Sequence, residues 1–248
     1  MIETNENLTG SMTLNVRDAA HLLNVSEKTV YRWIAERALP ARRVGDQYRL
    51  SRAEILDWVT ANRAEASIEL FTEPEEEAGT LPTLEEALTN GGVVYRVEGA
   101  TRDEVLRSAV AAARLPEGID PDFVYEVLRA RERLGSTAVG EGVAMPHPRH
   151  PLVLHVTRPS VTLGFLERPV DYGALDGKPV SALFLILSAT VRGHLNLLGR
   201  LALGLRQPGF SKAVRGQATR NVILREAARV DQLCREARAS TGRRGPGR

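Results

Sequence analysis

Hydrophobic and polar positions along the first sixty residues predict short helices around a hairpin. Hydrophobic side chains recur at the three- and four-residue spacing of an amphipathic helix at Val16, Ala19, Ala20 and Leu23. After a turn at Asn24-Val25, Ser26 suits the N-cap of a second helix, whose buried side carries Val30, Trp33 and Ile34. Two short helices joined by a tight turn are typical of a helix-turn-helix arrangement.

The pattern then changes to two short strands and a third helix. Residues 41–50 read as a hairpin around Gly45-Asp46. Ser51 and Glu54 have the spacing of a capping box, which opens a helix with an apolar side formed by Ile55, Leu56, Trp58 and Val59. These elements complete a small domain over residues 13–63.

From residue 81 to residue 239, helical and strand-like segments alternate, which predicts an α/β domain with helices on both faces of a sheet. Residues 81–98 indicate a helix, a Gly-Gly turn and a first strand. Further strands are expected near 142–145, 161–166 and 181–188, and helices near 101–114, 121–132, 194–206 and 226–238. The buried stripe of the 194–206 helix is expected at Leu195, Leu198, Leu201, Ala202 and Leu205.

The segment between these domains is strongly acidic. Residues 64–80 contain six glutamates and no lysine or arginine, which favours a flexible linker. A sharper alternative is that this segment folds over the basic hairpin as a mimic of DNA. Residues 1–12 and the basic, glycine-containing residues 240–248 are expected to be disordered termini.

Composition places the chain among ordinary globular proteins. Its 248 residues are 43% hydrophobic and 26% charged, with a net charge of +2. The single cysteine, Cys234, excludes an intramolecular disulfide. The longest apolar run, residues 180–191, is too short to span a membrane, and the polar, acidic N-terminus does not resemble a signal peptide. A cytoplasmic location without membrane insertion is therefore expected.

The run RERLGSTAVGEGVAMPH, residues 131–147, carries the most informative chemistry. It places His147 at the end of a loop in which Gly135, Gly140 and Gly142 allow backbone N–H groups to approach an anion. A neutral imidazole is a nucleophile, and the Arg131 guanidinium is suited to grip phosphate oxygens. These residues suggest transient phosphorylation of His147. On the loop alone, a glycine-rich turn with a surface histidine is the plainer interpretation.

This run resembles the phosphorylation motif of the fructose/mannitol/nitrogen-type (type 2) EIIA domains of the bacterial phosphotransferase system. The residues in register are Arg131, Glu132, Leu134, Gly135, Ser136, Thr137, Gly140, Gly142, Ala144, Pro146 and His147. The resemblance extends from about Leu81 to Leu233, and a second family histidine matches His194 at the opening of a later helix. One departure is Pro148, which replaces the usual small residue after the histidine and removes an N–H donor.

The resemblance implies a role for each site residue. His147 would accept a phosphoryl group from a histidine phosphocarrier, and Arg131 would neutralise its oxygens. His194 would donate a hydrogen bond to the phosphate or orient His147. Ser136 and Thr137 would add hydroxyl or backbone donors. From sequence position alone, Arg131 as a helix-end residue, His194 without a partner, and Ser136 and Thr137 as turn residues remain alternatives. Neither cofactor nor metal is expected, although His150 and His155 lie near His147.

The first domain resembles the excisionase/MerR-type winged DNA-binding domain. The matching residues are A-A-x-L-x-V-S-x-x-T-V-Y-R-W-I and then the L-P-A-x-R-x-G-x-x-Y-R-L wing. Nine basic residues against six acidic ones over residues 13–63 agree with a DNA partner. The expected contacts lie in the recognition helix and the wing: Ser26, Lys28, Thr29, Tyr31, Arg32, Arg42, Arg43 and Arg49. A merely solvated charged helix face is the alternative. A homodimer is expected, since one such module binds a half-site weakly.

The two resemblances predict a two-domain α/β protein, with a small winged helix-turn-helix domain before an EIIA-like domain that has a mixed sheet flanked by helices. The expected function is regulatory: phosphorylation of His147 would be linked to DNA binding. Two alternatives stay open. The chain could pass phosphate to a IIB partner, as a phosphotransferase-type carrier, or its EIIA-like domain could be a protein-binding module that is never phosphorylated.

Overall fold

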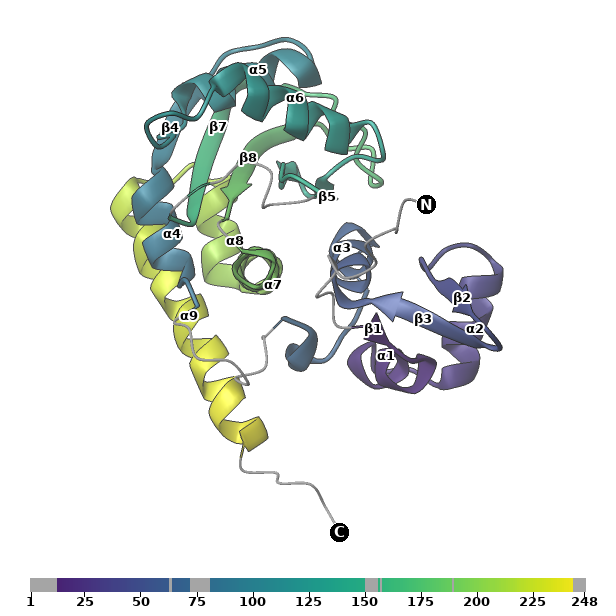
Figure 1. Cartoon of the computed structure of the whole chain (residues 1–248). Coiled ribbons are helices and arrows are strands. Elements are labelled where there is room, and N and C mark those ends of the chain that lie inside the picture. The colour runs from purple at the N-terminus through teal and green to yellow at the C-terminus, as the bar shows by residue number, and fades with distance from the viewer. Residues whose placement is uncertain are drawn as a thin grey trace.

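Two domains follow one another along the chain in the order that the hydrophobic pattern predicts. The computed structural model describes residues 13–62, 64–71, 81–149, 156, 158–188 and 190–242. Figure 1 shows the smaller N-terminal domain beside a larger α/β domain, with the last helix of the chain running along the outside of the larger domain. The expected disordered residues 1–12 lie outside the described residues, as do residues 243–248 of the tail.

The N-terminal domain contains three helices and a small antiparallel sheet, in the order β1 (Thr13–Leu14), α1 (Val16–Leu22), α2 (Glu27–Ala35), β2 (Arg42–Val44), β3 (Gln47–Ser51) and α3 (Arg52–Asn62). The strands are arranged β1-β3-β2. The predicted hairpin is confirmed, because β2 and β3 pair across a turn in which Gly45 has a φ of 60°. Strand β1, which pairs with β3, was not predicted.

Caps and aromatic packing explain these helices. The Ser26 side chain accepts a hydrogen bond from the Thr29 backbone N–H at 3.2 Å, as its predicted N-cap role requires. Helix α3 begins directly after Ser51, where the capping-box spacing placed it. The rings of Trp33 and Trp58 lie 5.0 Å apart and join α2 to α3, so both tryptophans belong to the packing of the domain.

The larger domain is built on a mixed five-stranded sheet with the order β4-β7-β8-β6-β5. The strands are β4 (Val93–Val97), β5 (Ala138–Gly140), β6 (Val143–Ala144), β7 (Ser160–Val170) and β8 (Val180–Leu187). Strand β7 pairs in parallel with β4 and antiparallel with β8, and β6 runs parallel to β8. The predicted mixed sheet is confirmed, and β5 is an addition to it.

Helices cover both faces of the sheet. On one face lie α5 (Arg102–Ala112) and α6 (Pro121–Glu132), and on the other lie α4 (Leu84–Gly91), α7 (Val191–Arg206), α8 (Pro208–Arg215) and α9 (Arg220–Gly242). Alternate residues of β8 point to opposite faces: Phe184 packs in one core and Leu185 in the other. Helix α8 was not predicted, and α7 and α9 begin three and six residues before their predicted starts at 194 and 226.

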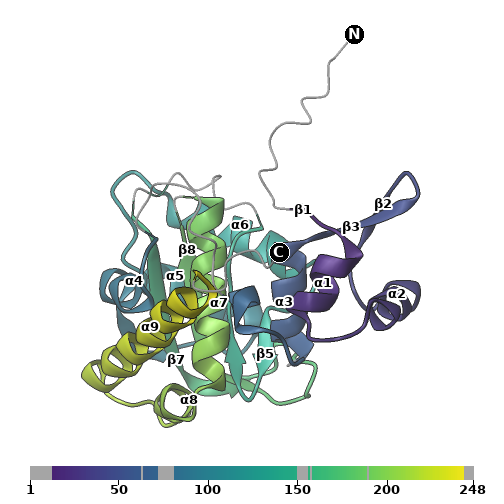
Figure 2. The same ribbon diagram turned by 90° about the horizontal axis from the view of Figure 1, so that it is seen from below.

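The N-terminal domain packs against the face that carries α7. Its core and the core beneath α4, α7, α8 and α9 form one continuous hydrophobic cluster. Figure 2 shows α1 and α3 on the side of the α/β domain and α2 and β2 on the far side. The arrangement leaves α2 and the β2-β3 hairpin, the elements predicted to contact DNA, pointing away from the larger domain.

The segment after α3 differs from the flexible linker that its acidity suggested. Residues 68–71 form a 3₁₀ helix, η1 (Ile68–Phe71), whose Leu70 and Phe71 are buried. Apolar side chains within this acidic segment supply packing that the count of glutamates conceals. Glu69 lies 3.5 Å from Nδ1 of His21 in α1, so it does not cover the basic hairpin as the DNA-mimic alternative would require. Residues 72–80 lie outside the described residues.

Candidate functional site

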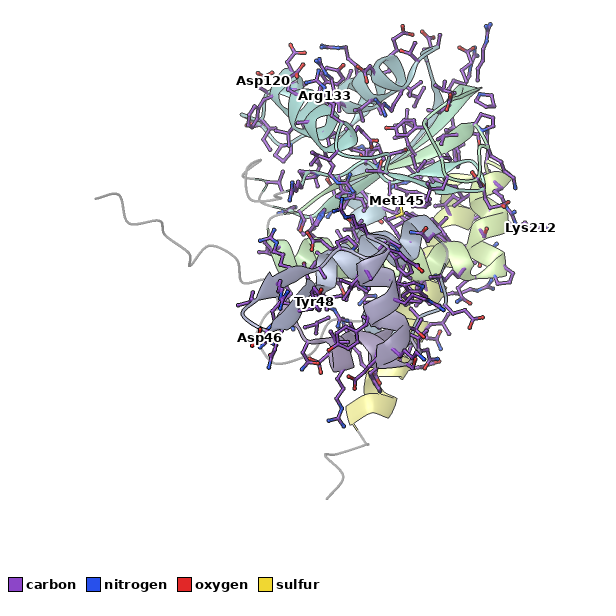
Figure 3. The ribbon with its side chains drawn as sticks, turned by 90° about the vertical axis from the view of Figure 1, so that its right-hand side faces the viewer. Asp46, Tyr48, Asp120, Arg133, Met145 and Lys212 are labelled. Atoms are coloured by element: carbon purple, nitrogen blue, oxygen red, sulfur yellow. The ribbon has the colours of Figure 1, made fainter. Side chains whose placement is uncertain are left out.

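His147 lies at the end of a backbone segment that is fixed to the sheet. The Met145 N–H donates to the Thr137 carbonyl, and the Ile186 N–H of β8 donates to the Pro146 carbonyl, each at 3.0 Å. Figure 3 labels Met145 at the place where the two domains meet. The His147 side chain is only 7% exposed, so the simple interpretation of a surface histidine on a turn does not describe it.

Backbone hydrogen bonding sets which nitrogen of His147 is reactive. Nδ1 lies 2.7 Å from the Met145 carbonyl oxygen. A carbonyl only accepts, so Nδ1 carries the hydrogen in this contact, and the lone pair of the neutral ring is left on Nε2. Burial lowers the pKa of His147 below 6.5; Asp57 opposes this effect and Arg131 adds to it. The ring is therefore a neutral base at pH 7 with Nε2 as its nucleophilic atom.

His194 lies beside His147 in the first turn of α7. The two ring centroids are 5.2 Å apart, and the helix is capped by Thr190, so His194 is the fourth helical residue rather than the first. Burial, followed by the proximity of His147 and Arg131, lowers the pKa of His194 well below 6.5. Among the described residues, Nδ1 of His194 is buried and has no hydrogen-bond partner.

Arg131 lies in the last turn of α6 and faces both domains. Its side chain is 16% exposed; Nη1 donates to the Gly135 carbonyl at 3.0 Å, and Nη2 donates to Asp57 at 3.3 Å. The bond to Gly135 corresponds to the helix-end role that was the plainer alternative. The other terminal nitrogen, Nη2, is directed at the carboxylate of Asp57, which lies next to His147. The structure thus brings His147, His194 and Arg131 together.

Ser136 and Thr137 use their side chains within the fold. The Ser136 hydroxyl donates to the Tyr172 carbonyl at 2.6 Å. The Thr137 hydroxyl and backbone N–H both bond to Glu132, whose pKa is raised by burial, with Thr137 acting in the opposite direction. Beyond them, residues 138–144 form the β5-β6 hairpin instead of an open loop of free amides. Phosphate contacts by Ser136 and Thr137 remain a prediction.

Asp57 of α3 completes the site, and sequence reasoning did not single it out. Its Oδ1 lies 3.9 Å from His147 Nε2, and its Oδ2 accepts from Arg131. In the sequence Asp57 is an ordinary polar position between the buried residues Leu56 and Val59 of an amphipathic helix. No local signal connects it with a histidine ninety residues later, so only the packing of the domains reveals it.

The predicted DNA contacts lie on one open surface of the N-terminal domain. Lys28, Tyr31 and Arg32 of α2 are exposed, as are Arg42 and Arg43 of the wing. The Ser26 and Thr29 hydroxyls lie 3.0 Å apart at the start of α2, and Tyr31 packs edge-on against Tyr48 of β3. Figure 3 shows Asp46 and Tyr48 in the wing, well separated from Met145.

Strand pairing concentrates positive charge in the wing. Arg42 of β2 stands directly opposite Arg49 of β3. Like charges placed opposite each other on a hairpin destabilise it, unless an anion lies between them. Arg43, in contrast, has the nearby acceptors Gly45 and Asp46. The Arg42–Arg49 pair is the feature of the wing best suited to a phosphate of a nucleic-acid backbone.

Other candidate features add little to this site. Within the described part of the chain, no group of three or more His, Cys, Asp or Glu side chains could hold a metal ion. His150 and His155 lie outside the described residues. Pro148 is buried next to His147. Among the described helices, none is long and apolar enough to cross a membrane.

Comparison with known families agrees with both resemblances. The model of the family "Phosphoenolpyruvate-dependent sugar phosphotransferase system, EIIA 2" matches residues 86–227, which is more than half of the chain. The protein therefore belongs to the EIIA 2 family. A helix-turn-helix domain model matches residues 13–63, the bounds expected for the first domain.

Individual relatives place the chain near regulatory members of this family. It is 36% identical over 144 residues to the nitrogen regulatory protein of Pseudomonas aeruginosa, covering 56% of this chain and 91% of the relative. The nitrogen regulatory protein of Bradyrhizobium diazoefficiens is 35% identical over 125 residues, covering 50% and 80%. The crystal structure of nitrogen regulatory protein IIA-Ntr from Neisseria meningitidis is 30% identical, covers 54% of this chain and 92% of that chain, and has a TM-score of 0.48. The chain is thus an EIIA 2 family protein that also carries a helix-turn-helix domain.

Proposed function

We propose that this protein is a DNA-binding regulator whose EIIA 2 domain accepts a phosphoryl group on His147 from a histidine phosphocarrier. The observation that carries the proposal is the state of His147. It is buried, neutral and held by Met145, and its free Nε2 faces the same space as the guanidinium of Arg131. Phosphoryl transfer needs a nucleophile that is held in position in its neutral form, with a cation beside it, and these residues supply both.

The chemistry of the transfer follows from these positions. The lone pair of His147 Nε2 attacks the phosphorus of the donor's phosphohistidine. The donor's N–P bond breaks, and its electron pair remains on the donor ring, which leaves as neutral imidazole. Arg131 stabilises the charge on the transferred oxygens. His194 Nδ1, which has no partner among the described residues, is a nearby group able to bond to them. Nδ1 of His147 keeps its hydrogen on the Met145 carbonyl.

Phosphotransfer tests the first half of the proposal. The protein is incubated with phosphoenolpyruvate, enzyme I and the histidine phosphocarrier of its host, and intact mass is followed. We expect one phosphoryl group on the wild type and none on His147→Ala. His21→Ala is the matched control, because His21 is 71% exposed in α1 and should leave labelling unchanged. Absence of label from every phosphohistidine donor would leave the domain as a protein-binding module. Onward transfer of the label to a IIB protein would favour a carrier.

DNA binding tests the second half. Fragments of the host genome are selected on the unphosphorylated and on the phosphorylated protein, and the affinity for the recovered sites is compared at fixed salt concentration. We expect the affinity to differ between the two states, which is the regulatory link. A variant with both Arg42→Ala and Arg49→Ala serves as the negative control for the wing. Equal affinity of the two states for DNA would mean that phosphorylation does not regulate DNA binding.

The pH dependence of phosphorylation should reflect the buried state of His147. The neutral ring is the reactive form, and burial lowers its pKa, so the midpoint of the decline in rate on the acid side should lie below the ordinary histidine value of 6.5. Asp57 raises the pKa of His147, so Asp57→Asn should move this decline further to the acid side. The measurement is the initial rate with prephosphorylated donor. A midpoint above pH 6.5 would contradict the buried, neutral assignment.

A further inference from the structure

The contact between Asp57 and the phosphorylation site has the geometry of a bound anion. One carboxylate oxygen accepts from Arg131 Nη2 at 3.3 Å, and the other lies 3.9 Å from His147 Nε2. These are the cation and the nucleophilic atom that the proposed phosphoryl transfer would use. A carboxylate and a phosphoryl group share negative charge and a preference for guanidinium donors. Asp57 thus lies where an incoming phosphoryl group would have to be placed.

The 3₁₀ helix η1 holds Asp57 in this position by binding both domains. On the N-terminal side, Arg52 of α3 donates to the Glu69 and Leu70 carbonyls. On the other side, the Phe71 backbone lies against Gly199 of α7, where an added Cβ would come within 2.6 Å of the Phe71 oxygen. Because α7 also carries His194, the segment connects α3 directly to the helix at the back of the site.

Arg206, at the end of α7, adds a second attachment for the same segment. Its Nη2 donates to the Ala64 carbonyl at 2.6 Å, and its guanidinium lies 5.0 Å from the centre of the Phe71 ring. The hydrophobic cluster shared by the two domains continues behind these contacts. Together they form an interface in which α3 lies over β5 and α7, with Asp57 directed at His147.

We infer that Asp57 is an internal occupant of the phosphoryl-acceptor site, and that docking of the DNA-binding domain and phosphorylation of His147 exclude each other. A phosphoryl group on Nε2 would occupy the 3.9 Å that now separate this nitrogen from Asp57. It would also bring about two negative charges next to the carboxylate. Since Arg131 can serve only one of these anions fully, the phosphorylated site expels Asp57 and α3 with it. This inference rests on the proposed function for the phosphoryl half of the competition.

Docking leaves the DNA-binding elements open. Helix α2 and the wing lie on the side of the N-terminal domain that faces away from the EIIA 2 domain (Figures 1 and 2). The switch therefore does not work by covering the DNA surface. It fixes the orientation of the DNA-binding domain when His147 is free and releases that domain when His147 carries phosphate, which changes how two such domains can be placed on neighbouring half-sites.

The experiment compares full-length wild type with Asp57→Asn, which keeps the shape of the side chain and removes its charge. Two readouts are taken: hydrogen exchange of the backbone amides of residues 64–71, and the rate of phosphorylation by prephosphorylated donor. Coupling between sites is typically 5- to 150-fold, so we expect Asp57→Asn to accept phosphate about tenfold faster. Exchange in 64–71 should rise in this variant and in phosphorylated wild type. Asp46→Asn, a fully exposed carboxylate of the wing, is the matched control and should change neither readout.

The outcomes separate the inference from the proposed function. If Asp57→Asn matches wild type in exchange and in phosphorylation rate, internal occupancy by Asp57 is overturned. If exchange rises but neither protein ever takes up phosphate, docking by Asp57 is supported and the phosphoryl-acceptor role of His147 is overturned instead. Phosphorylation of Asp57→Asn but not of wild type would support both the occupancy by Asp57 and the acceptor role of His147. In that case the Asp57 carboxylate would be what keeps the phosphoryl group from His147.

Discussion

Replacement of Arg131 by alanine is expected to slow phosphoryl transfer to His147 by about 10²- to 10³-fold, the usual effect of removing one preorganised group that stabilises transition-state charge. Arg131 is the cation that faces the His147 site, and its side chain is largely shielded from water, which strengthens its interaction with an anion. The measurement is a single-turnover rate with prephosphorylated donor. Arg133→Ala is the matched control, because Arg133 is exposed two residues further on, at the end of the same helix.

The same replacement also removes the partner of Asp57, so its two effects must be separated. Loss of docking would speed the reaction, whereas loss of charge stabilisation would slow it. Comparing Arg131→Ala in the wild-type background with the same change in the Asp57→Asn background isolates the second effect. Loss of less than about tenfold in the Asp57→Asn background would mean that another group stabilises the transferred phosphoryl, contrary to the usual size of such contributions.

Asp231→Ala is expected to lower the free energy of unfolding by about 3–5 kcal/mol, as is usual when one partner of a buried ion pair is removed. Asp231 in α9 is paired with Arg200 of α7, and both side chains are almost completely buried. Its two oxygens also accept from the Leu84 and Glu85 N–H groups at 2.9 and 3.0 Å, which caps α4. Alanine would remove the carboxylate paired with the buried guanidinium, whose Nε still donates to Asn196, and it would also remove the acceptor of two helix-end N–H groups.

Urea unfolding measures this change. Asp122→Ala is the control, because the Asp122 pair with Arg107 lies on the surface, where solvent screens it, and its loss should leave stability nearly unchanged. A loss for Asp231→Ala as small as that of the control would mean that water or another carboxylate reaches Arg200.

Sequence reasoning was strongest where the determinants are local. The Ser26 cap, the turn at Gly45 and strand β8 each depend on a few neighbouring residues, and each was predicted. The hairpin of β5 and β6 was less visible, because its strands are very short and its glycines resemble an open loop. Helix α8 was missed because it follows α7 after only Gln207. Arg131, His147 and His194, which the motif groups together, lie close to one another in the structure, although they come from three separate elements.

What the sequence left hidden depends on contacts between distant segments. Asp57 has no feature that distinguishes it from other polar residues on an amphipathic helix. Its importance arises only when α3 packs over α7. In the same way, the glutamates of residues 64–80 outweighed Leu70 and Phe71 in the sequence pattern, although burial of these two side chains is what orders the segment.

Because Asp57 and Arg131 belong to one polypeptide, the competition at the site does not depend on the concentration of this protein. A ligand tethered in the same chain meets its site at an effective concentration on the order of millimolar, whatever the concentration of the protein. Under the proposed function, a phosphocarrier from solution would have to compete with this fixed local supply of carboxylate. The threshold at which the site responds is thereby set by the amount and phosphorylation level of the donor. It does not shift when a cell makes more or fewer copies of this protein.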